Sequence, residues 1–150
     1  MINHSKIASD NFKCGYNCAQ SVFLAFAEEV GYSKEDALRL SSSFGGGMGR
    51  LREVCGACSA MFMIAGILKG YTEPNNDEIK AEHYKLIQDL AQKFKSKFGT
   101  IICRELLGLE EGEDETYIPS KRTEEYYQER PCENFIKYAA EIIEENLLNK

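Results

Sequence analysis

The residues of this 150-residue chain best suited to chemistry are its six cysteines. They are Cys14, Cys18, Cys55, Cys58, Cys103 and Cys132. In a secreted mini-protein they would indicate a disulfide framework, but MINHSKIASD contains no apolar export segment, and 150 residues can bury a core without such cross-links. We therefore expect a cytoplasmic protein in which the cysteines bind a metal or a cluster, or carry out thiol chemistry. For any single cysteine, the alternative is a small buried hydrophobic residue.

Four of the cysteines fall within the first turn or so of four different expected helices: Cys18, Cys55, Cys103 and Cys132. Free backbone N–H groups and the positive end of the helix dipole favour the thiolate at such positions. Four thiolates that meet at one site suit an iron–sulfur cluster or a tetrahedral zinc ion. The alternative is that the four cysteines fall at helix starts by chance.

The pair Cys55 and Cys58 forms a C-x-x-C motif, which has more than one interpretation. Ser59 follows it, so it is not a c-type haem attachment site, and no strand precedes it, so a thioredoxin-like context is missing. The upstream GGGMGR run lacks the Lys-Ser/Thr ending of a phosphate-binding loop. We expect this run to provide close, flexible packing where two helices meet.

The elements that must position the cysteines are helices, arranged around an apolar run over residues 54–68. Its apolar residues occur at helical spacing and on every face, so we expect a central helix enclosed on all sides. The run is too short for a membrane span. Further helices are expected over 5–12, 16–30 with Asn17 as N-cap, from Ser33 to about 44, from about 77 to 98, over 101–107 with Thr100 as cap, and from Pro131 to about 147.

The rest of the chain adds no second domain and no strand, because no stretch alternates with period two. Residues 109–131 are expected to form a flap or to contain a short helix, with the acidic run at 110–115 as solvated surface. His83 is expected to be a hydrogen-bonded core histidine, and His4 to lie in a mobile tail. We predict one all-α domain over 1–150, a compact bundle of five or six helices around the buried central one.

Composition narrows the classes of partner. The net charge of −6 and the lack of a large basic cluster argue against nucleic acid. The hydrophobic share of 43% and charged share of 28% are those of an ordinary globular protein, with no direct membrane insertion expected.

At these cysteines the sequence resembles the family of redox-active proteins named for its C_GCAxxG_C_C pattern. The resemblance is carried by NCAQSVF at 17–23, FGGGMGR followed by EVCGACSA at 53–60, GTIICRELLG at 99–108 and RPCENFIKYAAEII at 130–143. It implies that Cys18, Cys55, Cys103 and Cys132 are the family's four cysteines, with Cys14 and Cys58 as extra ones. Ala60 stands where the family has a second glycine.

The resemblance implies a redox role, and a looser similarity to parts of certain multihaem cytochromes favours an iron–sulfur cluster over zinc. The first hypothesis is an electron-transfer protein or oxidoreductase in which the four cysteines bind a [2Fe–2S] cluster or another metal. The second is metal-free thiol–disulfide exchange, with Cys55 attacking and Cys58 or another cysteine resolving. The third is a structural zinc domain or an accessory module of a membrane transporter. Neither the redox partner, a protein or a small molecule, nor the choice between monomer and homodimer follows from the sequence.

Overall fold

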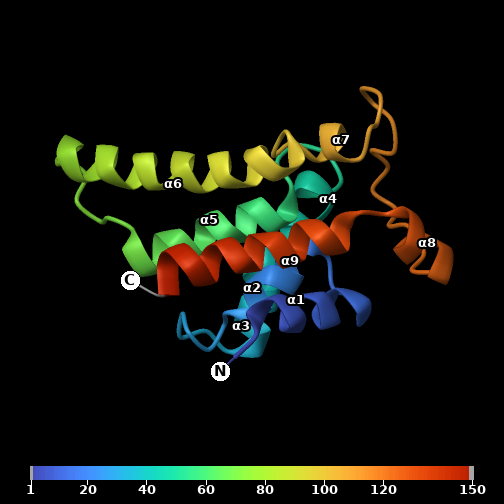
Figure 1. Ribbon diagram of the computed structural model, residues 1–150, viewed down its shortest axis with the longest axis horizontal. Coiled ribbons are helices and arrows are strands. Elements are labelled where there is room, and N and C mark those ends of the chain that lie inside the picture. Colours follow the sequence, from blue (N-terminus) through green and yellow to red (C-terminus); the bar gives the residue numbers. More distant parts are fainter. Residues whose placement is uncertain (1, 149–150) are drawn as a thin grey trace.

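The apolar run forms helix α5, Gly56–Lys69, in the computed structural model, which describes residues 2–148. Residues 56–61 are all buried, as are Ile64 and Ala65, whereas Ile67 in the last turn is exposed. The expected enclosure on all sides is therefore correct for most of the helix and wrong at its C-terminal end. The chain leaves α5 there through residues 70–76, which lead to the next helix (Figure 1).

Helices lie on both sides of a central pair formed by α5 and α9 (Figure 1). The long helix α6 contacts the pair from one side, and α1 and α2 contact it from the other, with α3 packed on α2. The helices of eight or more residues are α1 (His4–Lys13), α2 (Cys18–Ala25), α3 (Lys34–Ser41), α5, α6 (Asp77–Phe98) and α9 (Cys132–Ile143). The all-α prediction with five or six main helices is thus confirmed, and no strand occurs in residues 2–148.

Short elements fill the connections between these helices. They are a 3-10 turn (Ser42–Phe44), α4 (Gly45–Met48), α7 (Cys103–Leu106), α8 (Glu124–Glu129) and a π-helical turn (Glu144–Leu148) after α9. A short helix within the 109–131 segment was one of the two expected outcomes, and α8 is that helix.

Local capping signals locate several helix starts correctly. Asn17 caps α2 in a reciprocal arrangement with Gln20, and Ser33 accepts a hydrogen bond from the N–H of Asp36 at the start of α3. The predicted helix over 16–30 is too long, because at Phe26 the backbone turns to φ −111°, ψ 8° and its ring is buried against His4. Thr100 is not the cap of α7, since Ile102 takes that position.

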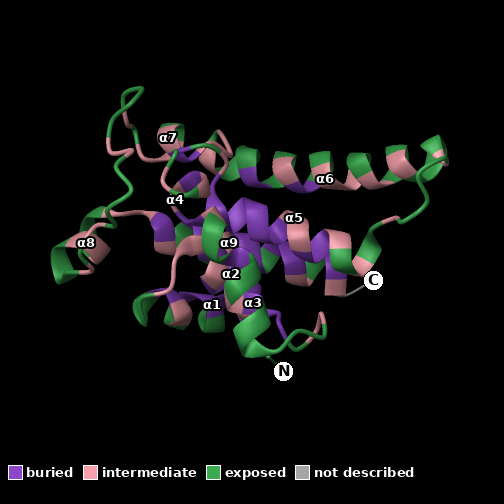
Figure 2. Ribbon diagram, turned by 180° about the vertical axis from the view of Figure 1, so that it is seen from behind, coloured by how far each residue is buried: buried purple, intermediate pink, exposed green. Residues whose placement is uncertain are grey.

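The hydrophobic core lies between α5 and the inner faces of the helices around it (Figure 2). Fully buried side chains include Phe12, Phe23, Phe26, Met61, Ile64, Phe94, Ile136 and Ile143. Each such side chain stabilises the fold by about 1.5–3 kcal/mol. Along the predicted stripe of α6 only Leu90 and Phe94 are buried, so this helix packs mainly through its C-terminal half.

Both histidine predictions are wrong. His4 is buried at the start of α1, stacks on Phe26, and bonds Glu29 and Glu144, so the N-terminal segment is fastened to the end of the chain. His83 lies at the edge of the fold beside Tyr71, and its Nδ1 has no hydrogen-bond partner among the described residues. Within residues 2–148, none of the helices combines the length and apolar character that a bilayer crossing requires.

Candidate functional site

The glycine cluster forms a left-handed turn. Residues 46–50 all have positive φ, between 59° and 72°. Glycine adopts this conformation freely, whereas Met48 and Arg50 adopt it at a cost of about 1–2 kcal/mol each. Strain of this kind persists where the surrounding structure requires it, which is most often at functional sites.

Two glycines, Gly47 in this turn and Gly56 at the start of α5, allow the segments that carry cysteines to approach closely. A Cβ on Gly47 would lie 2.7 Å from the Cβ of Cys103 and 2.7 Å from the backbone N of Glu53. A Cβ on Gly56 would lie 2.9 Å from the backbone N of Ala19 and 3.2 Å from the Cβ of Cys18. The turn therefore lies directly on Cys103, and the start of α5 lies directly on the start of α2.

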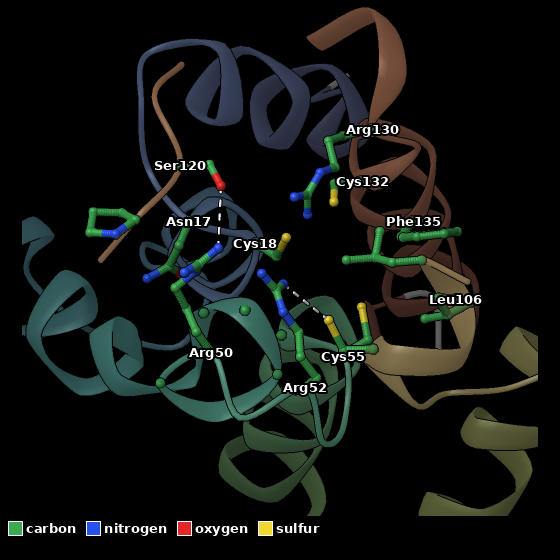
Figure 3. Close-up of a pocket in the computed structure, with 18 of the residues that line it drawn as sticks. Asn17, Cys18, Arg50, Arg52, Cys55, Leu106, Ser120, Arg130, Cys132 and Phe135 are labelled. Atoms are coloured by element: carbon green, nitrogen blue, oxygen red, sulfur yellow. Dashed lines mark hydrogen bonds between the residues drawn. The ribbon is translucent and has the colours of Figure 1, made fainter. Parts of the chain in front are cut away.

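Each of the four cysteines stands at the start of a different helix. Cys18, Cys103 and Cys132 are the first residues of α2, α7 and α9, and Cys55 is the N-cap of α5. All four line one cavity of about 300 Å³ (Figure 3). Sequence reasoning placed these residues at helix starts, and the tertiary structure brings those starts to the same end of the molecule.

The other two cysteines lie elsewhere. Cys14 is exposed at the C-terminal end of α1, and Cys58 is buried in the first turn of α5 and does not line the cavity. All six cysteines lie within the described residues and are free thiols. The four cysteines that the sequence singled out are therefore the four that line the cavity. Their role as ligands stays a prediction.

Four of the thiols shift one another's pKa in two pairs, Cys18 with Cys132 and Cys55 with Cys58. A hydrogen bond from Cys18, together with the positive charges of Arg130, Arg52 and Arg122, lowers the pKa of Cys132 despite its burial. The same hydrogen bond and burial raise the pKa of Cys18. A hydrogen bond from Cys58 and the backbone N–H groups at the start of α5 lower the pKa of Cys55. Burial, and then the bond to Cys55, raise the pKa of Cys58.

Arginines form a large part of the cavity wall. Arg50, Arg52, Arg122 and Arg130 all line it, and the wall includes no Asp, Glu or His among the described residues. Arg52 is only 3% exposed and donates a hydrogen bond from Nη1 to the Sγ of Cys103 at 3.6 Å. That contact opposes the effect of burial, which raises the pKa of Cys103.

Asp114 joins three of these arginines from the segment that covers the cavity. Its carboxylate accepts hydrogen bonds from Arg50 at 2.9 Å, Arg52 at 3.0 Å and Arg130 at 2.9 Å. Partial burial disfavours the charged carboxylate, but the bonds from Arg130 and Arg50 outweigh it and lower the pKa of Asp114. The acidic run is therefore not simply solvated surface, because Asp114 fastens residues 109–123 over the cysteines.

The chain matches a known protein family over most of its length. A family model described as "Putative redox-active protein (C_GCAxxG_C_C)" matches residues 16–146. The chain belongs to this family. Comparisons with curated proteins and with solved structures give no match. The region that matches the C_GCAxxG_C_C family contains all four cavity cysteines and begins after Cys14.

The donor set of this C_GCAxxG_C_C protein is made of thiols, the ligands that zinc and iron–sulfur clusters both use. Its four thiols converge on one cavity, and the arginines can balance the negative charge of thiolates. Within residues 2–148, no three His, Cys, Asp or Glu side chains are close enough to hold one metal ion.

Sequence reasoning missed the arginines and Asp114 as residues of the site. Arg50 ends the glycine turn and Arg52 follows it, so their position at a conspicuous motif was a signal that could have been used. Arg130 precedes Cys132 by two residues and gave a similar signal. Nothing in the acidic run distinguishes Asp114 from its neighbours, because its partners lie 16 to 64 residues away.

Proposed function

We propose that this protein transfers electrons through an iron–sulfur cluster held by Cys18, Cys55, Cys103 and Cys132. One observation carries the proposal: four cysteines from four helix starts line one cavity whose wall contains no carboxylate or imidazole among the described residues. The family's redox description supports the same class of activity. A [2Fe–2S] cluster is the first candidate, and zinc in the same sulfur cage is the alternative.

The residues around the sulfurs would have distinct roles. The four thiolates would be ligands, and the N–H of Arg52 would donate to the sulfur of Cys103, a contact of the kind that tunes reduction potentials. The buried first turns of α5 would keep water from one side of the site. When bound, such a cluster supplies one-electron transfer.

Anaerobic purification followed by iron and acid-labile sulfide analysis tests the proposal. We expect both elements, and replacing Cys18, Cys55, Cys103 or Cys132 with serine should abolish their retention and lower stability, since binding energy at such a site is folding energy. Two matched controls replace cysteines that do not line the cavity: Cys14→Ser at the end of α1 and Cys58→Ser in α5. Protein that lacks iron and sulfide and takes up no metal on reconstitution would refute the proposal. Zinc near one equivalent per chain without redox activity would favour a structural site.

A second candidate, metal-free thiol–disulfide exchange, is favoured by one specific observation. The pKa of Cys55 is lowered, and the largest cause is the thiol of Cys58, its partner in the C-x-x-C motif. In this reaction the Cys55 thiolate would attack a partner disulfide, and Cys58 would then resolve the mixed disulfide. Two cysteine thiols would become one disulfide while the partner's disulfide becomes two thiols.

The two candidate functions make different predictions for the variant Cys58→Ser. Cluster binding predicts that Cys58→Ser keeps iron and sulfide, whereas thiol exchange predicts that it traps a mixed disulfide and stops turnover. Loss of cofactor in Cys58→Ser together with full retention in Cys132→Ser would show that the wrong four cysteines were chosen.

A further inference from the structure

The cysteine cavity is strongly cationic in an acidic protein. The chain carries a net charge of −6, yet four arginines and no acidic residue in the described chain line this cavity. Clefts lined by one sign of charge concentrate ions of the opposite sign. The cavity therefore attracts anions although the molecule as a whole repels them.

The cavity has more arginines than there are carboxylates to pair with them. Arg50, Arg52 and Arg130 share the single carboxylate of Asp114. Arg122 donates to the backbone carbonyls of Phe12 and Tyr16 and has no carboxylate partner within residues 2–148. Four cations against one anion leave uncompensated positive charge at a partly buried site, where charges are normally paired.

Arg130 has the most hydrogen-bonding capacity left. Among the described residues its guanidinium group bonds only Asp114, through Nη2, although a guanidinium has five N–H donors. Arg50, in contrast, already donates to Thr116, Ile118, Ser120 and Asp114. The available donors are therefore on the Arg130 side of the cavity.

Arg130 and Arg52 point into the same space. Figure 3 shows both guanidinium groups directed toward the region beside Cys18 and Cys132. Only Arg52 makes a hydrogen bond to a sulfur atom, at Cys103, and Arg130 makes none within the described chain. Arg52 thus contacts a sulfur directly, whereas Arg130 acts on the Cys132 thiol through its charge alone and keeps most of its N–H donors free.

We propose that the arginine side of the cavity is a binding site for a small oxyanion, held by Arg130 and Arg52 next to the four sulfurs. Planar guanidinium groups bind phosphate, sulfate and carboxylate groups through two parallel hydrogen bonds. The cavity of about 300 Å³ limits the occupant to a free ion or to the anionic end of a small molecule. This site goes beyond the proposed electron transfer and exists whether or not a cluster is bound.

Isothermal titration with inorganic phosphate and with sulfate tests the proposal, on reduced metal-free protein and on protein reconstituted with iron and sulfide. We expect saturable binding in both forms. Arg130→Gln should weaken binding about tenfold to a hundredfold, and Arg130→Lys less. Arg39→Gln is the matched control, because Arg39 is exposed and pairs only with Glu35 within residues 2–148. Phenyl phosphate distinguishes the sources: equal binding indicates the anionic end of a larger molecule, and exclusion indicates a free ion.

A second measurement needs no variant. Phosphate should protect Arg130 from phenylglyoxal modification, read by peptide mass spectrometry, and should leave Arg39 unprotected. The proposal is overturned if neither ion binds wild-type protein saturably, or if Arg130→Gln binds as wild type does. It is also overturned if loading with iron and sulfide abolishes anion binding, because the arginines would then serve only the cluster. Iron and sulfide contents are measured separately, so failure here is distinct from failure of the proposed electron transfer.

Discussion

Replacing Gly47 with alanine should show how the left-handed turn positions Cys103. Gly47 has φ +72°, where an L-residue costs about 1–2 kcal/mol. The new Cβ would also lie 2.7 Å from the backbone N of Glu53 and 2.8 Å from the Cα of Arg52. Backbone atoms cannot rotate away, so overpacking adds about 1–3 kcal/mol. We expect Gly47→Ala to lower the free energy of unfolding by about 2–5 kcal/mol.

Gly49→Ala is the matched control in the same turn. Gly49 also has positive φ, +59°, but among the described residues the nearest neighbour of its added Cβ would be the carbonyl oxygen of Ser43, at 4.0 Å. Only the conformational cost applies, about 1–2 kcal/mol. Urea unfolding of the reduced, metal-free proteins measures both values. Equal losses of stability in the two variants would refute the close-approach argument, because both share the conformational cost and only Gly47 lacks space.

Two further predictions follow from the charges at the cavity. The lowered pKa of Asp114 means that its contribution to stability is present above the unfolded value near 3.8 and is lost as the pH falls through its lower folded value. Acid titration of stability should therefore show a steeper loss below about pH 4 in wild type than in Asp114→Asn, and parallel curves would contradict this. In metal-free protein, Cys132 should react with iodoacetamide at lower pH than Cys103, because the pKa of Cys132 is lowered and that of Cys103 is raised. Peptide mass spectrometry after timed alkylation measures the order, and the reverse order would contradict the opposite pKa shifts of the two thiols.

The sequence alone determined the helical class, most helix starts and the presence of the cysteines at those starts. These features depend on neighbours within one or two turns: the apolar period of 3.6 residues and the caps Asn17 and Ser33. Such signals stay readable because every interacting residue lies within a few positions along the chain. The end of the helix at Ala25 was misjudged because the burial of Phe26 against His4, a tertiary contact, decided it.

Only the tertiary structure decided how the site is built. Local patterns place a cysteine at the start of a helix, but they do not say that four such starts meet at one cavity. Arg52 bonds Asp114 across 62 positions, and His4 bonds Glu144 across 140. In an acidic run any of several carboxylates could have been the partner. The one that is used depends on which side chain the folded backbone brings within about 3 Å of Arg50, Arg52 and Arg130, which lie in the segments before α5 and α9.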